Sequence, residues 1–291
     1  MPGKSPADLA LTVRDRRFGR GQKMPHHWLA GDPVASAWFT ALSASFPRGE
    51  AMFIAAVKAH RDAADPVLAA QIRDFIRQEV NHSREHLAFN RAAEDAGYDL
   101  AAIDARVAAL VAMTEEKPPV IRLAITAALE HFTAIFSHQF LTRPEHFGHA
   151  DGDLAELWRW HAVEEIEHKA VAFDTLLHAT HDWTARRRWL LRAVVMADVS
   201  RRFLRNRWVD ALELLAQDGI TGWRASWRLF AYLWLKPGIL TRVLPAWAGW
   251  FAPGFHPWQT DDRHLIAGYQ ANTGQAGLHS PPDTSASPAS A

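Results

Sequence analysis

The chain has 291 residues, 48% of them hydrophobic, which is enough for a sizeable core in one large domain or two small ones. Its 32 Lys and Arg residues balance 32 Asp and Glu residues, and this neutrality argues against nucleic acid as the main partner. Because there is no cysteine, disulfides, thiolate nucleophiles and thiolate-ligated metals are excluded, and any metal site must use histidine and carboxylate ligands.

Apolar residues spaced three and four apart dominate the sequence, and alternating strand patterns are nearly absent, so the fold is predicted to be all-α. In chain order, helices are expected over 32–61 with an interruption at Pro47, then over 66–96, 100–115, 118–142, 151–178, 184–217 and 221–235. Four prolines break the segment 236–258. Four of the helices, near 47–61, 66–96, 118–142 and 151–178, are predicted to form an antiparallel bundle.

This pattern divides the chain into four parts. They are an N-terminal extension at 1–34, a helical bundle at 35–180 that carries the candidate ligands described below, a helical cap at 181–270 and a disordered Pro/Ser/Ala-rich tail at 271–291. No run of about 18 apolar residues is apparent, and the N-terminus lacks the apolar core of a signal peptide. A cytoplasmic location is therefore expected.

Two of the predicted bundle helices carry the same Glu-x-x-His pattern. Glu79 and His82 stand three apart in "RQEVNHSREH", and Glu165 and His168 stand three apart in "AVEEIEHKAVAF". An i,i+3 pair projects from one face of a helix, so each pair can contact the same ion. One such pair on a helix rich in Glu and His is usually chance, but the two segments also align with each other as an internal repeat of a helix pair.

A lone glutamate precedes each pair by about one helix hairpin. Glu50 has Phe46, Phe53 and Ile54 at helical spacing around it, and Glu130 lies in the apolar stretch "VIRLAITAALEHFTAIF". A carboxylate in such surroundings is strongly disfavoured unless a cation or a dense set of hydrogen bonds compensates it. Two Fe(II) or Mn(II) ions suit the resulting ligand set, because carboxylates neutralise two dications and one imidazole completes each side.

These residues resemble the ferritin-like di-iron carboxylate superfamily, which implies a ferritin-like four-helix bundle with additional C-terminal helices and a cofactor of two iron ions, with manganese as an alternative. More narrowly, "ALSASFPRGEAMF", "FIRQEVNHSREH" and "WHAVEEIEHKAVAFD" resemble a bacterial family labelled predicted metal-dependent hydrolase, over about residues 20–270.

His161 lies on the same helical face as Glu165 and His168. This His-x-x-x-Glu-x-x-His spacing is similar to that of the arylamine N-oxygenases, in which the first histidine is an extra iron ligand, although His161 can equally pack beside the site. The predicted metal ligands are therefore Glu50, Glu79, His82, Glu130, His161, Glu165 and His168. Supporting or surface roles are expected for Glu164 and Glu167, and a supporting or weaker ligand role for His86.

The resemblance implies an oxygenase or oxidase that uses O2 and an electron donor to oxidise an apolar or aromatic small molecule. The alternative is a metal-dependent hydrolase that uses a hydroxide held by two metals to cleave an ester or amide. Iron storage is disfavoured by the length of the chain and its extra Trp-rich helices. No Gly-x-Ser-x-Gly motif or phosphate-binding loop competes with a metal-centred reaction.

Residues 184–245 hold twelve Lys or Arg against four acidic residues, a local charge of +8, and six of the 13 Trp lie between 223 and 258. Three interpretations are open: a cap over the bundle with a solvated Arg face, peripheral contact of 184–258 with an anionic membrane, or a basic patch that attracts an anionic substrate. A homodimer is a further expected assembly. "PGFHPW" at 253–258 is a candidate channel wall in which His256 is structural, and Asp198 is a candidate partner of a liganding histidine.

Overall fold

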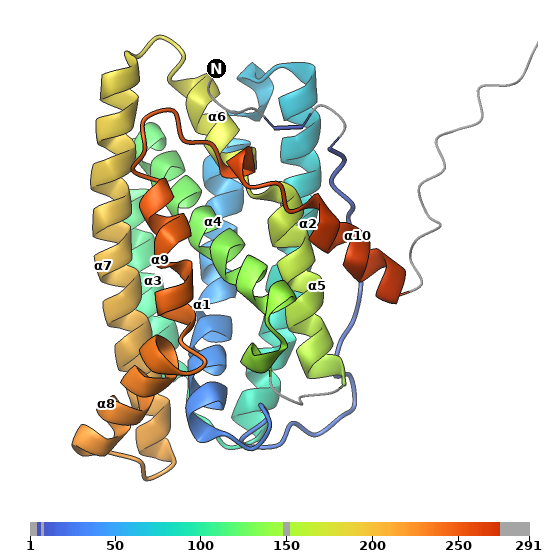
Figure 1. Ribbon diagram of the computed structural model, residues 1–291, viewed down its shortest axis with the longest axis vertical. Coiled ribbons are helices and arrows are strands. Elements are labelled where there is room, and N and C mark those ends of the chain that lie inside the picture. Colours follow the sequence, from blue (N-terminus) through green and yellow to red (C-terminus); the bar gives the residue numbers. More distant parts are fainter. Residues whose placement is uncertain (1–4, 7–8, 148–151, 274–291) are drawn as a thin grey trace, which may run out of the picture.

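The computed structural model describes residues 5–6, 9–147 and 152–273, and within these ranges the regular structure is helical, without a strand. The longer helices run side by side along the longest axis of the molecule (Figure 1). This arrangement confirms the all-α prediction. The predicted disordered tail lies outside the described residues from 274 onwards.

Four helices carry the predicted ligands: α1 (Pro33–Lys58), α2 (Pro66–Asp95), α4 (Pro119–Thr142) and α5 (Asp153–His168). Helix α1 packs against α2 and α4 packs against α5, while further contacts join α1 to α4 and α2 to α5. The short helix α6 (Val171–Ala179) continues from α5 and packs on α2 and α4. These pairings enclose one interior between the four helices, although a specific likeness to ferritin-like bundles stays a prediction.

The other helices surround this group. They are α3 (Ala101–Glu115), α7 (Ala185–Gln217), α8 (Gly222–Phe230), the π-turn η3 (Ala231–Leu235), α9 (Ile239–Gly249) and α10 (Arg263–Asn272), with short 3-10 turns η1 (Arg61–Ala63), η2 (Pro144–His146) and η4 (Pro257–Gln259). Helix α7 packs along α1 and α4, α9 packs on α4, and α10 packs on α5. The sequence analysis did not anticipate α10.

The helix starts follow from local chemistry. Asp32 accepts hydrogen bonds from the backbone N–H groups of Val34 and Ala35, and Asp65 caps α2 in the same way. Each cap is followed by a proline, whose fixed φ suits the first helical turn and whose missing N–H costs nothing there. Gly97 at φ 109° ends α2, because a residue with a Cβ rarely adopts that backbone angle.

The expected interruption at Pro47 is wrong, because α1 continues through this residue. A proline inside a helix leaves the carbonyl four residues earlier without its usual donor. Here that carbonyl belongs to Ser43, and the Asn90 side-chain amide on α2 donates to it at 3.2 Å. A side chain from the neighbouring helix thus replaces the missing backbone donor.

The expected continuous helix over 151–178 is also wrong. Helix α5 ends at His168, and α6 begins only at Val171. Neither glycine nor proline stands at the break. The Lys169 ammonium reaches out of the turn to the Asp262 carboxylate at 2.7 Å, so a partner distant in sequence accompanies this bend.

The N-terminal segment 9–32 lies against α2 and α5 rather than standing away from the fold. The backbone N–H of Arg14 donates to Glu164 on α5 at 2.8 Å, and that of Phe18 donates to Glu85 on α2 at 3.0 Å. The Trp160 indole N–H in turn donates to the Arg14 carbonyl at 3.1 Å. These bonds join a segment without regular structure to the helices that form the interior.

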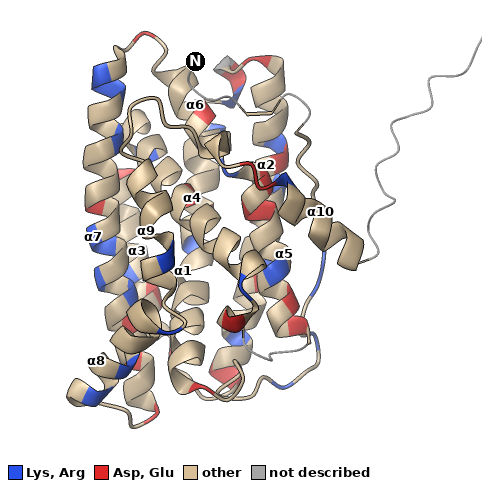
Figure 2. Ribbon diagram, viewed as in Figure 1, with Lys and Arg blue, Asp and Glu red and all other residues tan. Residues whose placement is uncertain are grey.

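Helix α4 is long and apolar enough to cross a membrane by length and composition, but 67% of its most apolar window is buried inside the protein, as expected of a core helix. Charged side chains are distributed unevenly over the other helices. Figure 2 shows Lys and Arg along α7 and on α8.

Candidate metal centre

The seven predicted ligands converge in the interior between α1, α2, α4 and α5. Each is at most 4% exposed. Their ligand atoms gather in two groups, within each of which all atoms lie within 4.8 Å of one another: Glu50, His82 and His161 in one, Glu79, Glu165 and His168 in the other. Glu130 adjoins the second group, with its Oε2 3.4 Å from the Nε2 of His168.

Glu165 connects the two groups. Its Oε1 lies 2.8 Å from the Nε2 of His161 and 3.4 Å from the Nε2 of His168. The Nδ1 of His82 lies 3.7 Å from the same oxygen. A carboxylate that faces imidazoles of both groups could contribute to holding an ion in either group.

Most of these side chains present atoms without a hydrogen-bond partner. The buried, unpartnered atoms of the cluster are Oε1 of Glu50, both carboxylate oxygens of Glu79 and of Glu130, Oε2 of Glu165, Nδ1 of His82 and Nε2 of His168. Buried polar atoms in folded proteins are nearly always satisfied, and each exception requires an explanation. Here the unpartnered atoms all belong to Glu and His, two residue types that can act as metal ligands, and they lie at one place. This arrangement fits bound cations.

Burial shifts the ionisation of these groups strongly. Burial, together with repulsion from neighbouring carboxylates, raises the pKa of Glu50 and Glu79 well above the usual value, and burial raises the pKa of Glu130 to about 7. Burial lowers the pKa of His82 to about 3 and that of His161 to about 4. The site therefore disfavours both charged carboxylates and imidazolium ions, whereas divalent cations favour carboxylates and neutral imidazoles.

Two residues depart from this pattern because they face each other. Burial lowers the pKa of His168, but Glu165 and Glu130 outweigh it and raise this pKa well above its ordinary value. Burial likewise opposes ionisation of Glu165, but the neighbouring His168 imidazolium outweighs it and holds its pKa well below the usual range. In the metal-free protein one imidazolium thus compensates part of the carboxylate charge, a role that a metal ion would take over.

A chain of hydrogen bonds fixes the protonation of His161. Asn90 donates its amide to the Ser43 carbonyl, so its Oδ1 accepts the Ser43 hydroxyl at 2.7 Å. The Ser43 oxygen then accepts from Nδ1 of His86 at 2.9 Å, and the Nε2 of His86 accepts from Nδ1 of His161 at 2.7 Å. The Nε2 of His161 consequently carries a lone pair directed at the Glu165 carboxylate.

The other two imidazoles are oriented in the same sense. Gln78 donates its amide to Glu167 and to the Thr12 carbonyl, so its Oε1 accepts from Nδ1 of His168 at 3.0 Å. The Nε2 of His82 donates to Glu164 at 3.1 Å. Such outer hydrogen bonds set the tautomer of metal-ligating histidines and leave the inner nitrogen free for the metal.

The structure resolves the open roles of three neighbours. Glu164 and Glu167 are buried, and the Arg14 guanidinium lies against both, 3.5 Å from Glu164 and 2.6 Å from Glu167. They are therefore supporting groups and not surface residues. His86 likewise supports His161 through its hydrogen bond.

The sequence analysis missed Arg14, Gln78, Ser43 and Asn90. Of these, only Gln78 carried a signal, since it is the repeat counterpart of Glu164. The remaining three become relevant only through contacts between segments distant in sequence.

The prediction that Asp198 supports a liganding histidine is wrong. Its carboxylate is 49% exposed and pairs with Arg201 and Arg202 on the same helix, α7. His256 is structural, as expected, because its Nε2 lies 2.9 Å from the Asp174 carboxylate and does not belong to the cluster.

An apolar cavity of about 170 Å³ reaches the first group of ligands. Glu50, His161 and Glu165 lie on its wall, and the rest of the wall comes mainly from apolar residues of α1, α3, α4 and α7, such as Phe46 and Phe136. Residues 253–258 do not line this cavity, so the expectation that they wall a channel is not met here. The cavity can bring an apolar molecule next to the candidate metal ligands.

The fold and the site define an all-α protein with a buried cluster of carboxylates and neutral imidazoles suited to divalent metals. The chain belongs to a family described as predicted metal-dependent hydrolases, whose model matches residues 12–261. This description favours the hydrolase alternative over the oxygenase interpretation. The comparison with curated proteins and the comparison with solved structures return no match.

Proposed function

We propose that the chain is a dinuclear metalloenzyme, with one ion held by the Glu50 group and the other by the Glu79 group. The observation that carries this proposal is the set of unpartnered Glu and His atoms in the two groups. Four carboxylates can neutralise two dications, and the lone pairs of His82, His161 and His168 are oriented toward the ions. Iron and manganese match this mixture of carboxylate and imidazole donors.

The family description supports a metal-dependent hydrolysis. The proposed substrate is an ester or amide of an apolar small molecule, because the cavity beside the ligands is apolar. Two bound metal ions supply Lewis acidity and a nucleophilic hydroxide at neutral pH. The chain's own residues orient the ligands and bind the substrate. Gln78, Glu164 and His86 hold the imidazoles by hydrogen bonds, and the apolar cavity binds the substrate. Phe46 and Phe136 contribute to the apolar wall of this cavity.

The second candidate is O2-dependent oxidation of an apolar or aromatic molecule, with an external electron donor. The donor set favours it, because four carboxylates with three imidazoles form the ligand pattern of di-iron oxygen-activating proteins that the sequence resembles. An apolar wall beside the ligands suits the same chemistry, which requires an apolar substrate in a dry site.

The hydrolase and the oxidase can be distinguished by the metal that supports activity and by whether O2 is consumed. The full chain is loaded with zinc, with manganese or with iron, and each form is tested for cleavage of nitrophenyl esters and anilides. The iron form is also reduced and mixed with O2 in an oxygen electrode. Hydrolysis by the zinc or manganese form without O2 uptake by the iron form supports the hydrolase, and the reverse supports the oxidase.

Metal content tests the proposal that both share. The parent is expected to hold two ions in its centre, and Glu165→Ala is expected to lose most of them, because Glu165 faces both groups. Full retention of metal by this variant contradicts the dinuclear proposal.

A further inference from the structure

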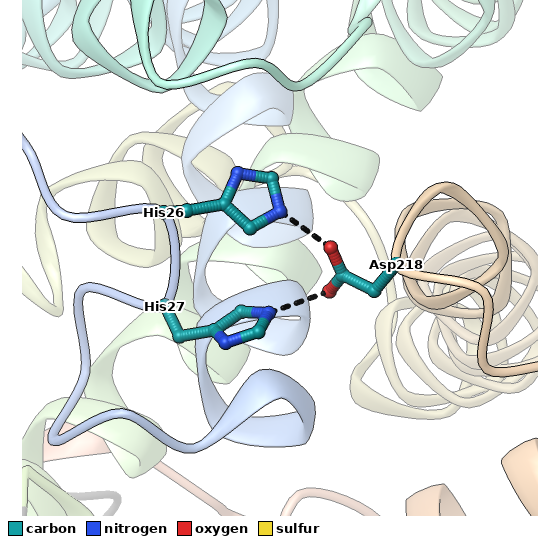
Figure 3. Close-up of side chains that lie close together, drawn as sticks. All are labelled: His26, His27 and Asp218. Atoms are coloured by element: carbon teal, nitrogen blue, oxygen red, sulfur yellow. Dashed lines mark hydrogen bonds and ion pairs between the residues drawn. The ribbon is translucent and has the colours of Figure 1, made fainter.

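A second cluster of ligand-type side chains lies where the N-terminal segment meets the C-terminal ends of α2 and α7. His26 and His27 point toward the carboxylate of Asp218, the residue that follows α7 (Figure 3). The Nε2 of His26 lies 2.5 Å from Oδ1 of Asp218, and the Nε2 of His27 lies 3.1 Å from Oδ2. All three ligand atoms lie within 4.8 Å of one another.

The hydrogen bonds of His26 show that this cluster requires a cation. Its Nδ1 lies 2.8 Å from the Ala96 carbonyl, which only accepts, so Nδ1 carries the proton. The Nε2 of a neutral His26 would then present a lone pair to a carboxylate oxygen, and the two would repel. A proton or a metal ion between them removes this repulsion.

Asp218 also receives other donors. The Tyr98 hydroxyl donates to its Oδ2 at 3.3 Å, and the Tyr98 ring stacks on His26 with centroids 4.2 Å apart. These contacts fix the carboxylate and one imidazole. The side chain of Asp218 is 4% exposed while those of His26 and His27 are 38% and 36% exposed, so an ion can reach the carboxylate from solvent between the two rings.

We propose that His26, His27 and Asp218 form a third metal site, for a zinc-type divalent ion. Two imidazoles and one carboxylate are a common protein ligand set for Zn²⁺, and the bond from His26 to a backbone carbonyl is the usual support of a zinc-bound histidine. The site is separate from the central cluster and is structural, because it joins the ends of α2 and α7 to the N-terminal segment.

Counting zinc in matched variants tests this site. The full chain is equilibrated with Zn²⁺ alone, freed of excess metal by gel filtration and analysed by mass spectrometry of the element. The parent is expected to hold one more zinc ion than His27→Ala and one more than Asp218→Asn. The control His264→Ala, at an exposed histidine elsewhere, is expected to match the parent.

The same difference is expected in a Glu79→Gln background, where at least one of the central ions is lost. The zinc difference therefore tests the third site independently of the proposed enzyme function. If parent, His27→Ala and Asp218→Asn hold equal amounts of zinc in both backgrounds, a proton alone occupies the cluster and the proposal is wrong.

An independent observation concerns the exposed face of α8 and the turn after it. Trp223, Trp227, Phe230 and Leu235 are exposed, with Trp223 at 73%. The rings of Trp227 and Phe230 stack with centroids 5.6 Å apart, and Trp223 lies one helical turn before Trp227 on the same side of α8. Soluble proteins rarely expose several large apolar side chains together without a partner.

Basic residues accompany this surface. Arg224, Arg228, Lys236 and Arg242 lie in the segment 219–260, which contains no Asp or Glu, and Figure 2 shows Lys and Arg on α8. Exposed Trp beside Arg, on a helix that presents a distinct apolar face, is the composition of helices that lie in a membrane interface. We propose that this aromatic face docks on an anionic membrane surface, whose charge the basic residues complement.

Vesicle sedimentation tests this surface. The full chain is expected to sediment with vesicles of equal parts phosphatidylcholine and phosphatidylglycerol, and not with pure phosphatidylcholine. The double variant Trp223→Ser/Trp227→Ser, and separately Arg224→Gln/Arg228→Gln, are expected to weaken binding on the order of tenfold. Val67→Ser/Met113→Ser, which removes exposed apolar groups elsewhere, is the control.

The alternative occupant is a second copy of the chain. Analytical ultracentrifugation of the parent and the Trp variant measures it directly. A dimer that the Trp substitutions dissociate, or the absence of binding to anionic vesicles at low salt, contradicts membrane docking.

Discussion

At the scale of single residues, the metal-free centre is held under electrostatic strain. Glu79 has no hydrogen-bond partner for either carboxylate oxygen, and neighbouring carboxylates add to the effect of burial on its pKa. A site of this kind lowers the stability of the empty protein and regains it when ions bind, because each binding step satisfies charges that are already in place.

The substitution Glu79→Gln is accordingly expected to have opposite effects on stability and on metal binding. It removes a buried acid that is only partly compensated by His168, whose Nε2 lies 3.2 Å from Oε1 of Glu79, and should raise the free energy of unfolding of the metal-free protein by about 1–3 kcal/mol. It should also abolish binding of at least one ion. Chemical denaturation in the presence of a chelator, together with metal analysis, measures both quantities.

Glu85→Gln is the matched control for that prediction, since it makes the same substitution on the same helix. Glu85 is equally buried but receives hydrogen bonds from Arg20, Arg84 and the Phe18 N–H. The Glu85→Gln variant should therefore be less stable than the parent, and it should keep its metal. Loss of stability in both variants would mean that Glu79 is compensated in the empty protein.

The chain of hydrogen bonds behind His161 gives a second prediction at this scale. Ser43→Ala removes the acceptor that fixes the tautomer of His86, and with it the lone pair that His161 presents to the centre. Metal affinity should fall by up to about 10- to 100-fold, the effect of losing a direct outer hydrogen bond of a metal ligand, because Ser43 acts on His161 through His86. Competition with a chelating dye measures this affinity.

The control Ser36→Ala also removes a buried hydroxyl from α1, one that accepts from the Leu29 N–H. It should lower stability by a similar amount without changing metal affinity. Equal affinity in Ser43→Ala and Ser36→Ala would show that His161 does not depend on the chain of hydrogen bonds.

The seven candidate ligands could be predicted because their signal is local. The i,i+3 pairs Glu79/His82 and Glu165/His168 are read from helix geometry alone, and Glu50 and Glu130 are conspicuous as acids among apolar residues. The hydrogen bonds from Asn90 through Ser43 could not be predicted, because they depend on how α1 and α2 are placed against each other.

At the scale of elements, helix starts were predictable and helix interruptions were not. The Asp-Pro starts of α1 and α2 are local signals that the structure retains. Whether Pro47 ends a helix depends on a donor from α2, and the break after His168 lies in a sequence without a breaker. The docking of segment 9–32 had no signal, because a segment without helical periodicity reveals neither its path nor its partners.

This N-terminal segment is expected to stabilise the fold mainly through Arg14. The guanidinium is buried and is the cation that faces Glu164 and Glu167. Arg14→Ala leaves two buried acids uncompensated and should lower the free energy of unfolding by about 3–5 kcal/mol. Denaturant unfolding monitored by circular dichroism measures the loss.

A second substitution separates charge from packing in this prediction. The double variant Arg14→Ala/Glu167→Gln removes one of the two acids left without Arg14 and should recover part of the lost stability. The control Arg17→Ala, at an exposed ion pair with Asp15, should change the free energy of unfolding by less than about 0.5 kcal/mol. If the double variant is no more stable than Arg14→Ala, the contribution of Arg14 comes from packing rather than from compensation of charge.

At the scale of the whole molecule, helices outside the central four complete the apolar cavity. Residues of α3 and α7 line the cavity together with residues of α1 and α4, so the space next to Glu50 and His161 depends on the outer helices as well as on the central four. The all-α class follows from periodicity, but this cavity could not be predicted, because its volume depends on how side chains from four helices meet.

The cavity is expected to select substrates by size. Thr133 lies on its wall on α4 and is only partly buried, so Thr133→Trp can fill part of the 170 Å³ without forcing a large side chain into the core. The variant should keep its metal and its activity toward the smallest substrates, whichever reaction the centre performs. Activity should fall progressively as the apolar part of the substrate lengthens, by about tenfold or more for the largest, since each excluded methylene removes about 0.8 kcal/mol of binding. Steady-state kinetics over a homologous series, with the similarly sized Thr133→Val as control, measures this dependence, and an equal loss for short and long substrates contradicts the cavity as the substrate site.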